Sequence, residues 1–246
     1  MNQIAETSVN SSTENRLLRR LAPEIQRDFL DRALRVVMPV GEVACEPGLS
    51  NHYIYLPTTG VLSTVVTLHD GSTVEAATIG NEGLVGLASV LDDSVNPCRT
   101  IQRVEGELLR IPSGEFRALL AGSPQMQQIV GRYVLTLLQQ CAQNVACHLH
   151  HKVPERMARW LLTTSDRTGQ SGFPVTQEFL GGMLGVSRQS VNATAGQLQQ
   201  AGLIAYRRGK LQITNRPALE SAACECYRVT NEAYRRLMRW NGNGSA

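Results

Sequence analysis

Several features are scarce or missing in this chain of 246 residues. It has no uninterrupted run of 18 apolar residues, so no segment is long and apolar enough for a membrane-spanning helix. Its first residues lack the basic start and the apolar stretch of a secretory signal. Both absences predict a cytoplasmic protein with no membrane partner.

Cysteines are few and widely spaced, and aromatic residues make up only 5% of the chain. No CxxC pair occurs, which argues against a zinc ribbon or a thioredoxin-type motif. The six cysteines are too sparse for a disulfide scaffold, so we expect reduced thiols and no metal site. With so few aromatic residues, the cores must consist mainly of Leu, Val, Ile and Ala.

Motifs of the common enzyme classes are also missing. The chain contains no P-loop, no GxSxG, no HExxH and no Rossmann glycine fingerprint. Three of its five histidines fall in one short segment, 148–151, which leaves little for a dispersed catalytic triad. The sequence therefore predicts that the protein is not an enzyme and requires no cofactor.

Charge is distributed unevenly along the chain. Residues 1–151 carry 11 basic and 15 acidic side chains, whereas residues 152–246 carry 13 basic and 6 acidic ones. Only Lys152 and Lys210 are lysines, and every other basic residue is arginine, whose planar fork suits phosphates and guanine edges. The basic C-terminal part indicates contact with a polyanion, although coding bias would also enrich arginine.

The pattern of residue types predicts an α+β fold in four parts. Residues 1–14 are polar and are predicted to form a disordered tail. Residues 15–122 begin with helical spacing and continue as short β-rich runs broken by turns such as Asp70-Gly71, which indicates a small β-sandwich or β-barrel. A long helix is expected over 123–151, and a compact helical module lies within 152–240.

The long helix is expected to begin at Ser123-Pro124, an N-cap followed by proline at the first helical position. Its apolar residues recur in steps of three and four, as in a coiled-coil seam, although packing on its own β domain would give the same pattern. The seam would consist of Met126, Val130, Tyr133, Leu137 and Cys141, with Ile129, Val134 and Leu138 beside them.

Residues 175–204 carry the pattern of a helix-turn-helix. Thr176 and Ser187 are placed to cap two successive helices, and Gly185 supplies the positive φ of the tight turn between them. The expected buried residues are Leu180, Met183 and Leu184 in the first helix and Val191, Ala195 and Leu198 in the second.

The outward face of the second helix suits DNA. Arg188 can bind guanine, and Gln189 or Asn192 can bind adenine. The following segment, 204–213, reads as a β-hairpin with a basic tip that would lie on phosphates. The alternative is a helical hairpin with a solvated, charged loop.

The order of helix, β-roll, long helix and winged helix-turn-helix resembles the CRP/FNR family of bacterial transcription regulators. The resemblance covers about residues 16–240 and is carried by T-x-x-x-L-G-x-x-L-G-V-S-R-x-S-V, starting at Thr176, and by the A-G-L-I that follows. It implies an N-terminal double-stranded β-helix (jelly-roll) sensor domain like those that bind cyclic nucleotides, a dimerisation helix and a C-terminal winged helix-turn-helix. It also implies a homodimer on a near-palindromic operator with half-sites about 34 Å apart. Double-stranded DNA would be the partner, with RNA polymerase a further one in an activator.

By the same resemblance, Arg188 would read a base, and Ser190 and Thr176 would contact the DNA backbone. Two positions depart from catabolite-activator-type members, which have Glu where this chain has Gln189 and a second Arg where it has Ala193. The operator should therefore differ from theirs. The complete set of expected DNA contacts is Thr176, Ser187, Arg188, Gln189, Ser190, Asn192, Arg207, Arg208 and Lys210.

The ligand of the sensor domain does not follow from the resemblance. Members that bind cAMP have a Gly-Glu pair for the ribose and an Arg-Ser pair for the phosphate. Here Leu87 follows Gly86, and Asn96-Pro97 stands where Arg-Ser belongs, with Arg99 and Thr100 close by. We therefore assign Gly86, Leu87, Arg99 and Thr100 to an effector pocket and do not expect cAMP in it.

The positions of the cysteines and histidines bear on redox and metal cofactors. FNR-type members bind an iron–sulfur cluster through N-terminal cysteines, and this chain has none before Cys45, so no such cluster is expected. Cys147, His148, His150 and His151 could bind a metal or haem, but we favour a polar helix end. Cys224 and Cys226 are expected within the last helix, where their thiols would point to different faces.

One other function stays open for this sequence. A ligand-binding or redox-sensing dimer could use its helix-turn-helix for protein contacts. The basic charge of the C-terminal part argues against it, because a protein-contacting module has no need of a cationic excess.

Overall fold

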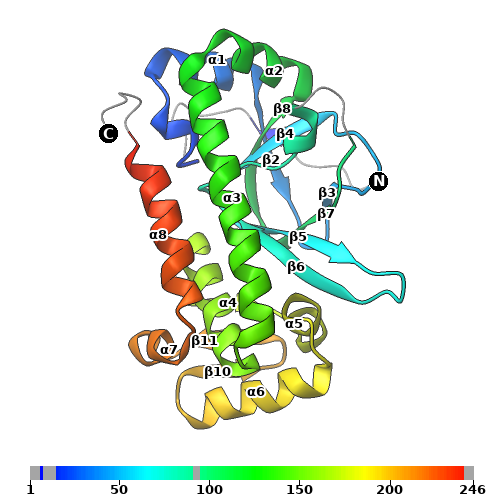
Figure 1. The fold of residues 1–246 in the computed structure, drawn as a ribbon, viewed down its shortest axis with the longest axis vertical. Coiled ribbons are helices and arrows are strands. Elements are labelled where there is room, and N and C mark those ends of the chain that lie inside the picture. The colour runs from blue at the N-terminus through cyan, green and yellow to red at the C-terminus, as the bar shows by residue number, and fades with distance from the viewer. Residues whose placement is uncertain (1–5, 8–14, 91–94, 241–246) are drawn as a thin grey trace. The chain divides into compact units, whose positions relative to one another are not determined.

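The computed structural model describes residues 6–7, 15–90 and 95–240 (Figure 1). The chain divides into two compact units. The first unit holds Met1–Thr64, Thr78–Leu138 and Ala233–Ala246, and the second holds Val65–Ala77 and Gln139–Glu232. The expected disordered tail, 1–14, lies outside the described residues except for strand β1 (Glu6–Thr7), which pairs with β2.

Two four-stranded sheets build the β-roll that the sequence predicts. Their strand orders are β1-β2-β8-β4 and β3-β7-β5-β6. Buried and half-buried residues alternate along β7, so one face of that strand points into the roll. The strands after β1 are β2 (Leu34–Met38), β3 (Val43–Cys45), β4 (Tyr53–Pro57), β5 (Val61–Thr67), β6 (Thr73–Ile79), β7 (Arg99–Val104) and β8 (Gly106–Pro112).

Helices close one end of the first unit. Phe29 and Phe116 meet edge to face with their ring centroids 6.4 Å apart, and the Tyr133 hydroxyl donates to the Leu84 carbonyl at 3.0 Å. The helical elements before the second unit are η1 (Leu18–Arg20), α1 (Pro23–Arg32), η2 (Leu87–Val90), α2 (Ser113–Gly122) and α3 (Pro124–His150). As predicted, Ser123 Oγ accepts from the Met126 N–H at the start of α3, at 3.2 Å.

The expected composition of the α3 seam is wrong. Met126, Val130 and Tyr133 are buried in the core of the first unit, so they cannot face a second chain. A neighbouring row of α3 is exposed instead. It consists of Leu135, Leu138, Ala142, Val145 and Leu149.

The second unit contains the predicted helix-turn-helix and hairpin. It also contains a three-stranded sheet in the order β10-β11-β9. Trp160 is part of the core of this unit, and its ring contacts the rings of Phe173 and Phe179. The elements of this unit are α4 (Val153–Thr168), β9 (Gly172–Pro174), α5 (Gln177–Leu184), α6 (Arg188–Gln200), β10 (Ile204–Arg207), β11 (Lys210–Ile213), α7 (Arg216–Ala222) and the first part of α8 (Cys226–Arg239), whose residues from Ala233 onward belong to the first unit.

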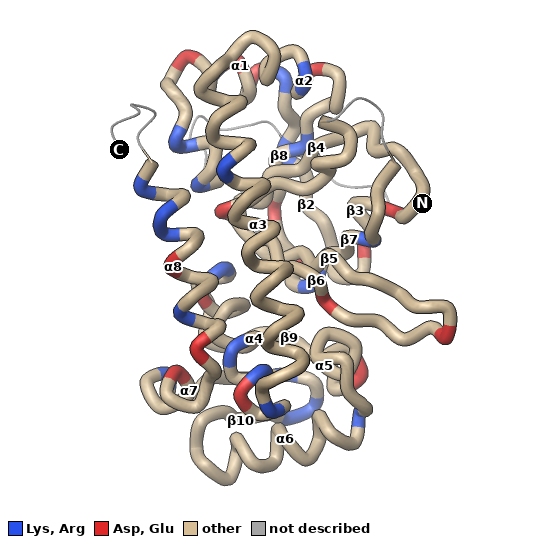
Figure 2. Tube along the Cα trace, in the orientation of Figure 1, with Lys and Arg blue, Asp and Glu red and all other residues tan. Residues whose placement is uncertain are grey.

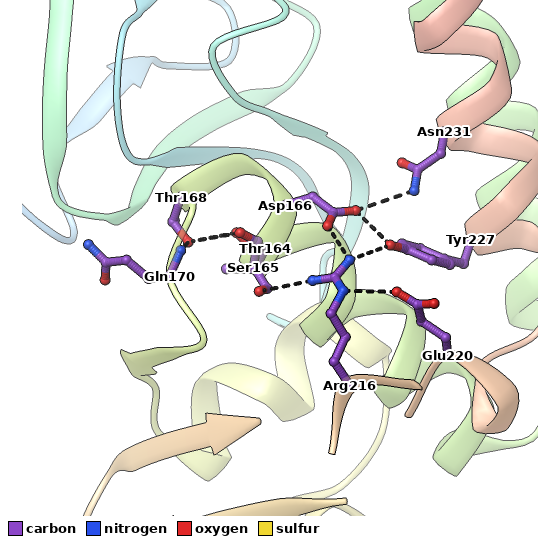
Figure 3. A network of polar contacts seen from close by, with 9 residues as sticks. All are labelled: Thr164, Ser165, Asp166, Thr168, Gln170, Arg216, Glu220, Tyr227 and Asn231. Atoms are coloured by element: carbon purple, nitrogen blue, oxygen red, sulfur yellow. Dashed lines mark hydrogen bonds and ion pairs between the residues drawn. The ribbon is translucent and has the colours of Figure 1, made fainter. Parts of the chain in front are cut away.

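A polar network joins α4, α7 and α8 within this unit (Figure 3). Arg216 donates to Asp166 and Glu220, and it also donates to the Tyr227 hydroxyl at 2.9 Å. Tyr227 in turn donates to Asp166 Oδ2 at 2.7 Å. Several charge-assisted hydrogen bonds therefore connect the last helices to α4.

The expectation that Cys224 lies inside the last helix is wrong. α7 ends at Ala222, and α8 begins only at Cys226. The backbone of Ala223 is extended, and Cys224 and Glu225 lie in the linker between the two helices. Within the described residues, no helix is both long and apolar enough to cross a membrane.

Candidate functional site

Local hydrogen bonds and two glycines shape the turn between α5 and α6. Thr176 Oγ1 accepts from the Phe179 N–H, and Ser187 Oγ accepts from the Ser190 N–H, both at 3.2 Å. Gly185 has φ +62°, a left-handed conformation that costs a side chain about 1–2 kcal/mol. A Cβ on Gly181 would lie 2.8 Å from the Val186 carbonyl oxygen, so glycine is needed there as well. The predicted caps and turn are therefore confirmed.

A buried arginine of α4 makes a hydrogen bond to the backbone at the start of this turn. Arg156 donates to the carbonyl of Leu184, the last residue of α5, and to the carbonyl of His148 at 3.1 Å. The free carbonyls at a helix C-terminus carry partial negative charge, so a cation stabilises them. The end of α5 is thereby fixed relative to α4.

The start of α6 presents the side chains expected to read bases. Arg188, Gln189 and Asn192 are exposed, and Ser190 is half-buried. Gln177 donates through Nε2 to Asn192 Oδ1 at 3.0 Å, which orients the Asn192 amide. No sequence pattern indicated this role for Gln177.

The hairpin of β10 and β11 closes in a two-residue turn at Arg208-Gly209. Both residues have positive φ, +51° and +73°, as a type I′ hairpin turn requires. Tyr206 anchors the hairpin, because its hydroxyl donates to the Val175 carbonyl at 2.8 Å. Arg207, Arg208 and Lys210 are exposed at the tip, as predicted.

A hollow of about 380 Å³ lies where these elements meet, and we call it the Arg188 hollow. Burial raises the pKa of the Tyr206 phenol, and the charge of Arg188 partly offsets that rise. Figure 2 marks the basic positions at the start of α6 and around β10 in blue. The lining residues are Thr176, Gln177, Glu178, Arg188, Tyr206, Arg208 and Gly209.

The hollow brings together only part of the predicted DNA-contact set. It contains Thr176, Arg188 and Arg208. The other predicted contacts lie outside its lining on α6 and on the hairpin: Ser187, Gln189, Ser190, Asn192, Arg207 and Lys210. Sequence reasoning missed Glu178 and Tyr206. An aromatic residue in the basic hairpin was the one signal that could have indicated Tyr206.

A second, larger cavity of about 760 Å³ lies in the first unit between the β-roll and α3, and we call it the apolar pocket. None of its described lining residues is charged. Its polar atoms include the hydroxyls of Thr64 and Thr100, which lie 3.0 Å apart and hydrogen-bond to each other. Apolar residues supply most of the wall: Ile79, Leu84, Val85, Leu87, Val90, Val95, Leu120, Val130, Val134, Leu135 and Leu137.

Three of the four predicted effector residues line this pocket. These are Gly86, Leu87 and Thr100. Arg99 does not line it, because its guanidinium is paired with the Glu46 carboxylate at 2.6 and 2.9 Å. Gly86 has φ +98°, and a Cβ there would lie 2.9 Å from the Tyr53 carbonyl oxygen, so glycine is required at this point of the wall.

A thiol in the wall is shielded from water. Cys45 is buried, and burial raises the pKa of its thiol to about 11. Asn51 donates to the Cys45 sulfur at 2.8 Å. The thiol is therefore neutral at physiological pH, as are the described groups around it in the pocket wall.

Comparison with known protein families finds two matching domains. Residues 35–123 match the family described as "Cyclic nucleotide-binding domain", and residues 155–222 match the "Crp-like helix-turn-helix domain". The chain belongs to the CRP/FNR family. Members of this family are transcription regulators, which agrees with the resemblance seen in the sequence. A search of curated proteins found no match.

Solved structures of CRP/FNR regulators share this fold. TTHB099 of Thermus thermophilus, a CRP-family transcriptional regulator, has a TM-score of 0.65 at 18% identity and covers 76% of this chain and 95% of its own. FixK2 of Bradyrhizobium japonicum gives 0.65 at 17%, covering 78% and 98%. CLP, the c-di-GMP-responsive global regulator of Xanthomonas campestris, gives 0.63 at 19%, covering 79% and 100%.

Proposed function

We propose that this CRP/FNR protein is a homodimeric regulator that binds a specific, near-palindromic DNA site and responds to an uncharged, largely apolar effector. The observation that carries the DNA-binding part is the capped, glycine-closed turn that exposes Arg188, Gln189 and Asn192 on the first turns of α6. A helix presented in this way fits the major groove.

The proposed contacts fall into two classes. Arg188, Gln189 and Asn192 read base edges, because their forked side chains can make paired hydrogen bonds with guanine or adenine. The backbone class consists of Thr176, Ser187, Ser190, Arg207, Arg208 and Lys210, which are exposed or half-buried around the Arg188 hollow. Phosphate contacts of this kind fix the register of the protein on DNA without specifying its sequence.

Dimerisation is proposed through the exposed apolar row of α3. Leu135, Leu138, Ala142, Val145 and Leu149 recur in steps of three, four, three and four, which is the heptad spacing of a coiled coil. Leu135 and Leu149 are 67% and 75% exposed in the single chain. Such exposure of a regular apolar stripe favours burial against a second copy of the same helix.

The apolar pocket supports an uncharged effector. A cyclic nucleotide carries an anionic phosphate, whose desolvation requires a cation or several donors in the site. The described lining offers no cation, and Arg99 is already paired with Glu46. Leu135 belongs both to the pocket wall and to the proposed dimer seam, so a bound effector could alter the packing of the seam.

Selection from a randomised duplex pool with the purified full-length protein, at near-physiological salt, tests the DNA-binding proposal. We expect a near-palindromic site, and we expect Arg188→Ala to lose the preference at one base pair of each half-site. Arg228→Ala, which removes an exposed arginine of α8, is the matched control and should select the unchanged site. If Arg188→Ala selects the same site as the natural chain, the assignment of α6 is wrong.

The effector proposal is tested separately with the neutral dye Nile red and with cAMP. Nile red should bind the purified protein in a one-to-one ratio, and cAMP should not displace it. If no DNA is selected with or without a pocket ligand, the alternative of a helix-turn-helix that contacts protein gains support. If cAMP displaces the dye at micromolar concentration, the uncharged-effector proposal fails while DNA binding stands.

A further inference from the structure

Four potential metal ligands converge in the second unit, away from the Arg188 hollow. Cys147 and His151 lie one turn apart at the end of α3, Cys224 lies in the linker before α8, and Cys226 is the first residue of α8. Their ligand atoms are all within 4.8 Å of one another. The three cysteines are buried, and His151 is half-buried.

Two of the distances among these atoms match a single tetrahedral ion, and every other pair lies within 4.8 Å. A zinc ion bound to sulfur at about 2.3 Å and nitrogen at about 2.0 Å holds two sulfurs about 3.8 Å apart, and a sulfur and a nitrogen about 3.5 Å apart. The Cys147 and Cys224 sulfurs are 3.6 Å apart, and Cys226 Sγ lies 3.4 Å from His151 Nδ1. An iron–sulfur cluster would distribute its ligands over two or more irons and hold them farther apart than the 4.8 Å within which all four ligand atoms lie.

Neighbouring polar groups are placed as an outer layer of a metal site. His151 Nε2 is 3.1 Å from Glu225 Oε2, so the carboxylate can hold the ring with Nδ1 facing the thiols. Gln143 donates through Nε2 to Cys226 Sγ at 3.0 Å, as an amide does to a metal-bound thiolate. The first contact leaves Nδ1 of His151 facing the thiols, and the second would stabilise a metal-bound thiolate at Cys226.

We propose that Cys147, His151, Cys224 and Cys226 bind one structural Zn²⁺. Three thiolates and a neutral imidazole give the complex a net charge of −1, and the three thiol protons pass to solvent on binding. Four protein ligands leave no open position, which is typical of a structural site and not of a catalytic one.

The ion would join segments that lie far apart in the sequence. It would fasten the end of α3 to the linker between α7 and α8, inside the unit that carries the helix-turn-helix. This inference does not rest on the proposed DNA binding, because it concerns only whether the four ligands hold a metal.

Metal analysis of the full-length protein, purified under reducing conditions, tests the proposal. We expect one zinc per chain, and we expect Cys224→Ser and Cys226→Ser to lose it. Cys141→Ser, on the same helix as Cys147 but outside the group, is the matched control and should keep the zinc. Less than about one-tenth of an equivalent in the natural chain, or equal zinc in Cys224→Ser, would overturn the proposal.

Cobalt spectroscopy covers the case in which a cysteine variant does not fold. The metal-free natural chain, reloaded with Co²⁺, should show the strong visible bands of a tetrahedral thiolate site. Glu225→Gln keeps all four ligands, and it should bind zinc about 10–100-fold more weakly, as loss of an outer-layer partner usually does. Glu232→Gln, an acidic residue of α8 paired with Arg228, is its control and should bind zinc normally. A Cys147–Cys224 disulfide in the metal-free protein, without cobalt bands after reduction, would contradict the site.

Discussion

The apolar pocket and the Arg188 hollow are opposite solutions to ligand binding within one chain. The pocket is about 760 Å³ in volume and has no charged residue in its described lining, whereas the hollow is about 380 Å³ and contains Glu178, Arg188 and Arg208. The pocket is suited to a neutral ligand that is held by burial, and the hollow to a polyanion that is held by charge. The two sites should therefore respond to different solution conditions.

Salt should separate the two sites by the largest margin. With Arg207, Arg208 and Lys210 from each chain, a dimer would contact roughly six phosphates, and its DNA affinity should fall about 10³-fold between 50 and 200 mM salt. Nile red binding in the pocket should be almost unchanged over that range. Fluorescence anisotropy of labelled DNA and dye fluorescence measure both. A flat DNA curve would contradict the role of the basic hairpin.

Alkaline pH should lower the free energy of unfolding through Cys45, a buried thiol in the wall of the apolar pocket. Burial raises the pKa of Cys45 from 9.0 to about 11. Between these values the unfolded chain releases the thiol proton and the folded chain keeps it, so the free energy of unfolding should fall with rising pH by about 3 kcal/mol. Urea unfolding from pH 8 to pH 11 measures the slope. Cys45→Ala should reduce the fall by this amount, and Cys141→Ala should leave it unchanged. The arginines of the hollow do not titrate in this range.

Around the hollow, the loss of a base contact and the loss of a phosphate contact should have different effects on DNA binding. Arg188→Ala should cost about 1–3 kcal/mol of binding to the selected site and relax specificity at one base pair. Lys210→Ala should weaken binding to all sequences alike and lower the salt slope by about one for each phosphate that the variant no longer neutralises. Anisotropy titrations on the selected site and on single-base variants distinguish the two. Identical profiles for the two variants would show that Arg188 contacts only the backbone.

Replacing either of two helical glycines should give the smallest effect, a small gain in stability, and only one of the two replacements should affect the pocket. A Cβ on Gly131 of α3 or on Gly196 of α6 would meet nothing within 4 Å, and alanine is the better helix former. Each Gly→Ala change should therefore raise the free energy of unfolding by about 0.5–1 kcal/mol. Only Gly131 lines the apolar pocket, so only Gly131→Ala should reduce Nile red affinity. Equal dye binding in both variants would place the dye elsewhere.

Local features of the second unit were predictable from the sequence because each depends on neighbouring residues. Residues close together in the sequence determine the caps at Thr176 and Ser187, the left-handed Gly185 and the basic hairpin. The exposed row of α3 was not predictable in this way. Apolar residues occur on both sides of that helix, and only the contacts of Met126 and Tyr133 with the β-roll core show which side is covered.

Groups formed by distant residues could not be read from spacing alone. Cys147 and Cys224 are 77 residues apart, and the helix break that turns Cys224 toward Cys147 falls at Ala223, without a glycine or proline to signal it. The absence of charged residues from the described lining of the apolar pocket could not be predicted from the sequence either. Arg99 is close to the expected position in sequence, and only its ion pair with Glu46 shows that it is turned away from the lining.

The turn between α5 and α6 also bears on how the DNA target of this protein could change during evolution. Gly181 and Gly185, with the buried Leu180 and Val191, fix the path of the backbone, and none of them is among the proposed base contacts. Substitutions at exposed positions such as Gln189 therefore leave the frame of the turn intact. A lineage could acquire a new operator through one or two codon changes at the helix surface while inheriting the same folded support.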